Sequence, residues 1–427
     1  MGGRSQVVAP DGTVLGEAGE AEEVLVVDLD VAQVAAWRAA FPVLADRRLS
    51  TPLQRHTFRT VLKVCLCRKV GLSPGGGLTL RAMVYSEYGA LPTLQEVPEP
   101  HCPADGVVVA VEATGVCRSD WHAWMGHDPV ALPHVPGHEL AGTIAEVGPD
   151  VTRWRVGDRV TVPFACGCGT CLVCRAGNSQ VCPNQTQPGF THWGSFADRV
   201  ALHAADSNLI ALPDTVSAVD AAALGCRFAT AFGALVGRGR LASGEWLVVH
   251  GVGGVGLSAV MIGMALGARV VAVDVSPAAL DQAGELGAEV VIRTTDKDDP
   301  TLVARQVIDA TEGGAHVTID AFGSTATALA SIGGLRQRGR HVQVGLLSPP
   351  TRSCRSPWVR WWRVSRDPRI ARPRGRRLPP MMDLLASGAL DPGRLVGQVI
   401  GLDEAGRALA ELGSPGRPPG LTVVRLR

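Results

Sequence analysis

The sequence predicts an α/β protein in which a β-rich domain is followed by a doubly wound parallel sheet. In residues 245–347, runs of β-branched residues such as EWLVVH and ARVVAVD alternate with amphipathic stretches of helix length. This alternation is typical of a parallel sheet that helices cover on both faces. In residues 83–210, short Val-rich runs such as VVVAVEATG are separated by Gly, Pro and Asp, which indicates a barrel-like β domain.

The parallel sheet can be assigned element by element. Each expected strand is a continuous apolar run, and each expected helix lies between two such runs. We expect strands at 245–251, 268–274, 289–294, 315–323 and 340–347, with helices that end near 266, 286, 311 and 335.

Composition and charge exclude several classes of function. The chain has 427 residues, enough for two ordinary domains, and a formal net charge of only +1, so nothing indicates binding to nucleic acid or an anionic membrane. The N-terminus has no apolar signal segment, and Gly residues and Arg269 interrupt the longest apolar zone, which argues against a membrane span. We therefore expect a cytoplasmic protein, in which clustered cysteines bind metal more often than they form disulfides.

A glycine-rich turn indicates a dinucleotide site. The motif GVGGVG, which includes Gly254, follows the strand EWLVVH and places Gly251, Gly253 and Gly256 in the pattern GxGxxG at the start of a helix. Such a turn lets the backbone approach a pyrophosphate, and the helix N-terminus favours the phosphate charge. Asp274 ends the next strand, where a carboxylate accepts hydrogen bonds from ribose hydroxyls and repels a 2′-phosphate, so NAD is favoured over NADP. The alternative is a Gly-rich connector in which Asp274 caps a helix.

Four cysteines are spaced for a closed metal site. Cys168, Cys171, Cys174 and Cys182 form CxxCxxC followed by a seven-residue gap. Four thiolates complete the tetrahedral shell of zinc and leave no open position, so this zinc would be structural. The alternative is four buried or oxidised thiols, and the nearby Cys166 is interpreted as a bystander.

A catalytic zinc needs three protein ligands and one open position, and the ligands can be far apart in sequence. Cys117, His138 and Cys226 are candidates. Spacing alone does not distinguish them from cysteine and histidine residues that simply pack in a core.

Six separated motifs resemble one family in their order. They are GVCRSDWH, PHVPGHELAG, VGDRV, CGTCLVC, LGCRFATAF and GVGGVG, and together they resemble the zinc-dependent alcohol dehydrogenases of the medium-chain dehydrogenase/reductase family. The resemblance covers residues 83 to about 347 and resumes at 381–427. It implies a GroES-like zinc-binding catalytic domain at 82–210, a Rossmann NAD-binding domain at 211–347, and a C-terminal part at 381–427 that returns to the catalytic domain.

The resemblance also implies roles for residues around the catalytic zinc. Cys117, His138 and Cys226 match its ligands. Glu139 matches a carboxylate behind the metal that can enter its coordination during ligand exchange. Asp120 matches the partner that fixes the tautomer of the ligating histidine. A second, structural zinc and NAD complete the expected cofactors.

Four further residues match positions around the substrate and cofactor. Ser119 matches the hydroxyl that contacts the alcohol and passes its proton, through the cofactor ribose, to His122. Arg118 matches a pyrophosphate contact, and Thr230 lines the nicotinamide side. Three tryptophans are candidate walls of the substrate pocket: Trp121, Trp124 and Trp193.

The expected function is transfer of a hydride between an alcohol and NAD, giving an aldehyde or a ketone. The alternative is an inactive pseudoenzyme or gene remnant that retains zinc and nucleotide binding. NADH formation from a panel of alcohols distinguishes the two.

Residues 348–380 depart from the family pattern. The segment is dominated by Arg, Pro and Trp, as expected of a GC-rich gene read out of frame, and our hypothesis is a pair of compensating frameshifts. The family would place an edge strand here, which commonly pairs two subunits. A homo-oligomer is therefore expected by resemblance, but this segment puts it in doubt because Pro and unpaired Arg do not form such a strand.

Residues 1–50 resemble the C-terminal end of a carbon–nitrogen hydrolase of the nitrilase-like family. The catalytic Glu, Lys and Cys of that family would lie upstream, so the resemblance does not imply hydrolase activity. Residues 51–81 show no coherent period and are interpreted as a disordered linker.

Overall fold

The structure is a computed structural model that describes residues 79–347, 381, 384–385, 387–414 and 420–427, and the backbone of residues 6–8 and 14–17. The chain divides into two units, Met1–Gly76 and Gly77–Arg427. In the first unit, β1 (Gln6–Val8) pairs antiparallel with β2 (Val14–Glu17). The predicted linker ends too late, because residues 79–81 already lie in strand β3 (Thr79–Val84). The rest of that linker, the rest of the hydrolase-like segment and the aberrant segment lie outside the described residues.

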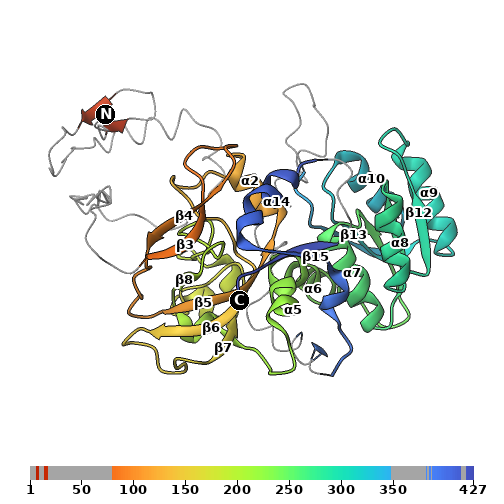
Figure 1. Cartoon of the computed structure of the whole chain (residues 1–427). Coiled ribbons are helices and arrows are strands. Elements are labelled where there is room, and N and C mark those ends of the chain that lie inside the picture. The colour runs from red at the N-terminus through yellow and green to blue at the C-terminus, as the bar shows by residue number, and fades with distance from the viewer. Residues whose placement is uncertain are drawn as a thin grey trace, which may run out of the picture. The chain divides into compact units, whose positions relative to one another are not determined.

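The β-rich part of the second unit is built on a seven-stranded sheet with the order β15-β16-β5-β6-β7-β9, in which β8 also pairs with β5. Its pairs are antiparallel except β15 with β16. The strands are β5 (Val107–Val116), β6 (Leu140–Val147), β7 (Arg159–Thr161), β8 (Arg199–Leu202), β9 (Ile210–Ala211), β15 (Val396–Ile400) and β16 (Leu421–Arg425). A separate hairpin joins β3 (Thr79–Val84) to β4 (Thr93–Pro98). The C-terminal strand β16 thus lies beside β5 (Figure 1).

Five parallel strands form the second sheet, in the order β12-β11-β10-β13-β14. They are β10 (Trp246–His250), β11 (Arg269–Asp274), β12 (Val290–Arg293), β13 (Ala315–Asp320) and β14 (Leu335–Gln343), and they alternate with α7 (Gly254–Ala265), α8 (Pro277–Glu285), α9 (Pro300–Ala310) and α10 (Thr325–Gly333). The predicted fold class is confirmed. The last strand begins at Leu335, earlier than the expected residue 340, and its pairing with β13 shifts in register between Ala315 and Val317. Arg338 lies within it at a φ of 63°.

Burial shows that helices cover both faces of this sheet. Along β10, Leu247 and Val249 pack with residues of α7 and α8, whereas Val248 packs on the opposite face with residues of α9 and α10. The alternation follows from the two-residue repeat of a strand. The carboxyl ends of the strands therefore remain open for loops that carry chemistry.

A kinked helical run links the two parts of this unit. It comprises α5 (Ala218–Ala223), the π-helical turn η3 (Leu224–Phe228), α6 (Ala229–Phe232) and a second π-helical turn η4 (Gly233–Gly239). Gly225, with φ of −58° and ψ of −119°, makes the kink. The run is long and apolar enough to cross a membrane, but 78% of its most apolar window is buried inside the fold, as in a core helix.

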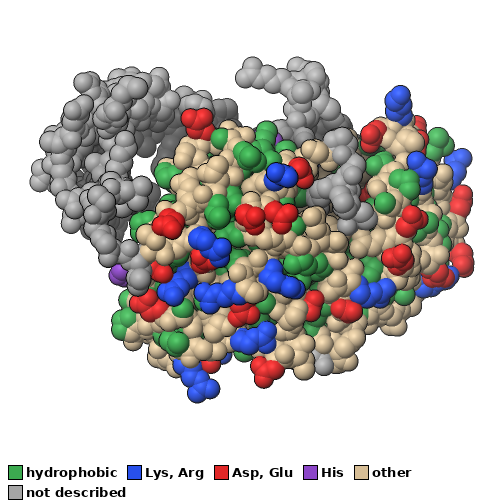
Figure 2. Space-filling model, in the orientation of Figure 1, with side chains coloured by type: hydrophobic (Ala, Val, Ile, Leu, Met, Phe, Trp, Pro, Cys, Tyr) green, Lys and Arg blue, Asp and Glu red, His purple; other side chains and the backbone are tan. Residues whose placement is uncertain are grey.

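The other helices in the described part of the chain are short. They are α2 (Arg118–Trp124), α3 (Leu172–Arg175), η2 (Ser179–Val181), α4 (Ala205–Asn208), η6 (Pro392–Leu395), η7 (Leu402–Glu404) and α14 (Ala405–Glu411). On the face shown in Figure 2, Lys and Arg side chains are interspersed with Asp and Glu side chains.

Candidate active site

Two cysteines, a histidine and a glutamate converge where the two parts of the unit meet. The ligand atoms of Cys117, His138, Glu139 and Cys226 all lie within 4.8 Å of one another. Cys117 caps the N-terminus of α2 directly after β5, His138 and Glu139 directly precede β6, and Cys226 follows the kink at Gly225. The structure therefore brings the three separated candidate ligands to one point.

A buried carboxylate orients the histidine. Asp120 accepts a hydrogen bond from Nδ1 of His138 at 2.8 Å and from the backbone N–H of Cys117 at 3.1 Å. In the neutral ring that a metal requires, donation from Nδ1 leaves the other ring nitrogen, Nε2, with its lone pair. That Nε2 atom is buried and has no hydrogen-bond partner among the described residues. An orphaned imidazole lone pair beside two thiols is the donor set that zinc takes, so the residues fit the expected ion.

The two thiols of this group perturb each other. Their mutual hydrogen bond lowers the pKa of Cys117 well below its usual value and raises the pKa of Cys226 well above it. Both sulfurs must be thiolates to bind zinc, so metal binding is coupled to the loss of the protons that this group holds.

Glu139 is paired with an arginine that was not singled out from the sequence. Arg227 donates to the Glu139 carboxylate from its backbone N–H at 3.0 Å, from Nε at 3.2 Å, and also from Nη2. Burial raises the pKa of Glu139, while the Arg227 charge opposes that rise. One feature of the sequence could have indicated this arginine: it is a lone basic residue directly after Cys226 in the apolar run LGCRFATAF.

The glycine-rich turn lies between β10 and α7. Gly251 has a φ of 84°, a backbone conformation that favours glycine. A Cβ on Gly256 would lie 2.0 Å from the carbonyl oxygen of Gly251, whereas a Cβ on Gly253 would meet nothing within 4 Å. The turn is thus tightly packed at its ends and open at Gly253, as the approach of a pyrophosphate requires.

Asp274 lies at the end of β11 against this turn. Its Oδ2 accepts a hydrogen bond from the backbone N–H of Val252 at 2.7 Å, and its Oδ1 accepts one from Ser276 at 2.8 Å. The carboxylate is therefore next to the turn that would hold the dinucleotide. The chain's own residues thus fit a nucleotide cofactor as well as a metal ion.

The other predicted residues lie on α2 and α6. Ser119 and His122 are half-buried on α2, and Thr230 is buried in α6. Arg118 donates to the carbonyl oxygen of Leu412 and stacks 4.3 Å above the ring of Trp121.

The His122 imidazole has a histidine neighbour. Burial lowers the pKa of His122, and the nearby Arg118 and His127 lower it further. The Nδ1 atoms of His122 and His127 are 3.2 Å apart. His122 therefore remains neutral, and able to accept a proton, to a lower pH than an ordinary histidine.

Two phenylalanines lie against the candidate metal ligand. The rings of Phe190 and Phe164 have their centroids 5.3 Å and 6.4 Å from that of His138. Neither was singled out from the sequence, because one phenylalanine in a loop carries no periodic signal. Trp124, an expected pocket wall, is buried in a core cluster and donates to the carbonyl oxygen of Ala90.

The four clustered cysteines form a second potential metal site. The ligand atoms of Cys168, Cys171, Cys174 and Cys182 lie within 4.8 Å of one another. Backbone N–H groups point at the sulfurs, as from Cys174 to Cys171 at 3.4 Å and from Asn184 to Cys182 at 3.3 Å. Such bonds stabilise thiolates, so these residues fit a closed zinc site. Cys166 lies outside the group, and burial raises the pKa of its thiol to about 12.

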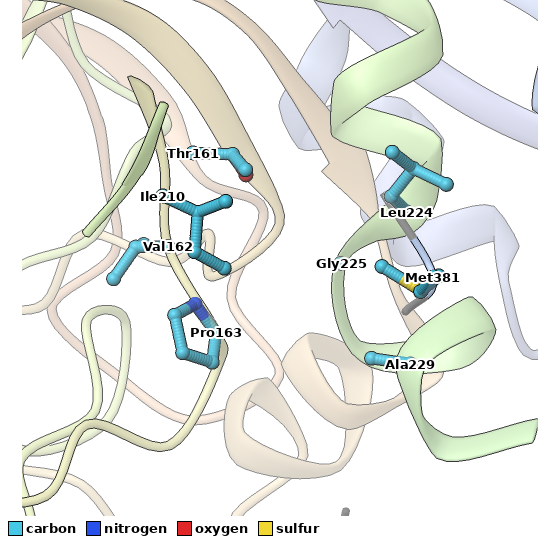
Figure 3. Close-up of a pocket in the computed structure, with 8 residues that line it drawn as sticks. All are labelled: Thr161, Val162, Pro163, Ile210, Leu224, Gly225, Ala229 and Met381. Carbon is cyan, nitrogen blue, oxygen red and sulfur yellow. The ribbon is translucent and has the colours of Figure 1, made fainter. Parts of the chain in front are cut away.

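A small apolar cavity lies beside the kink that carries Cys226. Figure 3 shows Leu224, Gly225, Ala229 and Met381 on one side of it, with Ile210 and Thr161, Val162 and Pro163 on the other. The space accessible to the centre of a water molecule is about 10 Å³, close to the minimum for one water. It is therefore too small to hold a substrate.

Comparisons with known proteins agree with this geometry. The family model described as "Alcohol dehydrogenase GroES-like domain" matches residues 103–214, and "Zinc-binding dehydrogenase" matches residues 254–364. The second match extends into the segment 348–380, and neither reaches residues 1–50.

Two curated relatives are an alcohol dehydrogenase of Geobacillus stearothermophilus and one of Rhizobium meliloti (strain 1021). The first is 36% identical over 274 residues, 64% of this chain and 78% of the relative. The second is 35% identical over 283 residues, 65% of this chain and 79% of the relative.

Solved structures are also similar. The alcohol dehydrogenase TADH from Thermus sp. ATN1 has a TM-score of 0.71 and 28% identity, covering 81% of this chain and 100% of that chain. A thermostable alcohol dehydrogenase from Pyrobaculum aerophilum, solved with cobalt and zinc bound, has a TM-score of 0.67 and 26% identity, covering 82% of this chain and 100% of that chain.

Proposed function

The chain belongs to the family of zinc-binding alcohol dehydrogenases, and we propose on that basis that it transfers a hydride between an alcohol and NAD, giving an aldehyde or a ketone. The observation that supports this most strongly is the convergence of Cys117, His138 and Cys226 around the unpartnered Nε2 of His138. Three ligands leave a fourth zinc position for the substrate oxygen, as catalytic zinc sites require.

The proposed chemistry divides between cofactors and side chains. Zinc held by these ligands would supply Lewis-acid stabilisation of the alcohol oxygen, and NAD held at the glycine-rich turn would accept the hydride. Asp120 keeps His138 in the tautomer that presents Nε2. Phe164 and Phe190 exclude water from the side of His138 that they cover.

The hydroxyl proton leaves through α2 in this proposal. Ser119 receives it from the alcohol, and His122 takes it towards solvent. Both side chains are half-buried, which suits groups that connect a buried site to water. Arg118 and Thr230 would contact the cofactor.

The preference for NAD over NADP rests on Asp274. Its carboxylate lies against the glycine-rich turn, where it can accept hydrogen bonds from ribose hydroxyls and repels a 2′-phosphate. The four-cysteine group, Cys168, Cys171, Cys174 and Cys182, would hold a zinc with no open position and so a structural role.

We also propose that the protein is cytoplasmic. The cysteines of the described residues are all free thiols, the state that a reducing cytoplasm maintains. Homo-oligomerisation stays a prediction, because the strand that would pair subunits falls in 348–380, outside the described residues.

The test is NADH formation by the purified protein with a panel of primary and secondary alcohols, followed by absorbance and run with NAD and NADP in parallel. We expect alcohol-dependent reduction of NAD, with NADP a poorer acceptor. Binding of zinc and NAD without turnover of any alcohol would instead support the inactive pseudoenzyme.

A further inference from the structure

The residues that directly follow two candidate zinc ligands form a buried ion pair. Glu139 follows His138, Arg227 follows Cys226, and their side chains are 0% and 8% exposed. Three N–H groups of Arg227 point at the Glu139 carboxylate. The pair therefore ties together the two chain segments that carry these ligands.

Two glycines make room for the carboxylate. A Cβ on Gly115 would lie 2.5 Å from Oε2 of Glu139, and a Cβ on Gly225 would lie 2.6 Å from its Cβ. Contacts this short are incompatible with any other residue at these positions unless Glu139 moves. The carboxylate is thus confined by packing as well as by the ion pair.

The aliphatic stem of Arg227 lies against the dinucleotide turn. A Cβ on Gly254 would lie 2.6 Å from Cδ of Arg227, and Gly254 is the first residue of α7. Arg227 therefore contacts the carboxylate beside the metal ligands through its N–H groups and the turn that would hold the pyrophosphate through its stem.

We propose that Arg227 is a positioning residue that keeps the Glu139 carboxylate off the catalytic metal and links its position to the dinucleotide turn. This inference rests on the proposed function. A carboxylate is itself a good zinc ligand, and Glu139 lies within 4.8 Å of the ligand atoms. With both oxygens engaged by Arg227, the carboxylate leaves the fourth position to the substrate oxygen.

The test uses the purified full-length protein with cobalt in place of zinc, because the visible spectrum of cobalt reports its ligand set. Arg227→Met removes the N–H donors and keeps much of the aliphatic stem. We expect this variant to change the cobalt spectrum. We also expect it to alter the rate of metal release to a chelator about 10- to 100-fold, the range by which loss of such a partner changes metal affinity. Arg227→Lys, which keeps the charge, should give a smaller change.

The linkage to the dinucleotide turn has its own readout. In the wild-type protein, saturating NAD should change the rate of metal release, because binding at two linked sites is coupled. In Arg227→Met, NAD should leave that rate unchanged. An equal effect of NAD on both proteins would overturn the linkage.

Two comparisons separate positioning from general destabilisation. Arg340 pairs with Glu245 at the other end of the sheet, so Arg340→Met is the matched control and should keep the wild-type spectrum and release rate. Adding Glu139→Gln to Arg227→Met should restore the spectrum of Glu139→Gln alone, because the competing carboxylate is gone.

The inference is overturned if Arg227→Met keeps both the wild-type cobalt spectrum and the wild-type release rate. If Arg227→Met does not fold, the same result in Arg227→Lys overturns it. It is also overturned if adding Glu139→Gln to Arg227→Met does not restore the cobalt spectrum of Glu139→Gln alone. Failure of the proposed function looks different, since the wild-type protein itself would then bind no metal at Cys117, His138 and Cys226 or would oxidise no alcohol.

Discussion

Asp120 shows how one side chain organises the site. It is fully buried and accepts hydrogen bonds from His138 and from the backbone of Cys117 and Gly137. Replacing it by Asn removes the negative charge. The amide NH₂ group would then face one of these N–H groups and could not accept a hydrogen bond from it. We expect Asp120→Asn to lower the turnover of alcohol about 10- to 100-fold, measured as NADH formation. The exposed Asp214 provides the control, since Asp214→Asn should leave turnover within about twofold of the wild-type value.

His122 predicts the pH dependence of alcohol oxidation. In the role proposed for it, as proton acceptor, it must be neutral. Burial with Arg118 and His127 lowers its pKa, against the smaller opposing effects of Cys117 and Asp128. The acid limb of the rate should therefore lie below the ordinary histidine pKa of about 6.5. His127→Ala removes a neighbouring charge and uncovers the ring, so this limb should move to higher pH. An unmoved limb in the pH profile of His127→Ala would contradict the assignment.

At the scale of elements, the loop around α3 depends on its four cysteines. The loop has little apolar packing of its own, since Leu172 is 83% exposed, so metal binding must supply much of its stability. We expect Cys171→Ser to reduce the zinc content from two ions to one per chain and to lower the melting temperature. Cys166→Ser, outside the group, should retain both ions. Metal analysis of the two variants provides the comparison.

The end of β10 makes the parallel sheet sensitive to acid. His250 is buried there, and burial lowers its pKa to about 3, whereas the unfolded chain binds its proton near pH 6.5. Between these values the unfolded state takes up a proton that the folded state does not, so stability falls as the pH decreases. One such group costs about 1 kcal/mol of unfolding free energy between pH 6.5 and 5.5.

Urea unfolding at these two pH values measures that cost. His250→Leu should lose about 1 kcal/mol of the pH dependence, whereas the same substitution at the exposed His101 should lose none of it. Identical pH dependence in the wild type and in His250→Leu would show that the buried imidazole does not titrate as described.

At the scale of the whole molecule, the parallel sheet could be predicted because its central strands, β10, β11 and β13, are buried on both faces and so must be continuous apolar runs. The four-cysteine group could be predicted because its ligands are close in sequence. The pair of Arg227 and Glu139 could not, because 88 residues separate them and only the fold brings them together. The same holds for Phe164 and Phe190, whose contact with His138 comes from distant loops.

Parts of the sequence analysis stay predictions. The boundaries of the domains at 82–210 and 211–347, the frameshift at 348–380 and the hydrolase-like origin of residues 1–50 are not tested by the described residues or by the family matches. The family match that continues to residue 364 does show that similarity does not stop abruptly at 347.

The central claim is that three side chains from separate segments share one metal ion. Anomalous diffraction at the zinc edge, from crystals of the purified full-length protein, tests it most directly. We predict one zinc about 2.0–2.3 Å from Nε2 of His138 and from the sulfurs of Cys117 and Cys226, and a second among Cys168, Cys171, Cys174 and Cys182. A zinc-loaded crystal with an anomalous peak at the four cysteines and none beside His138 would contradict the account.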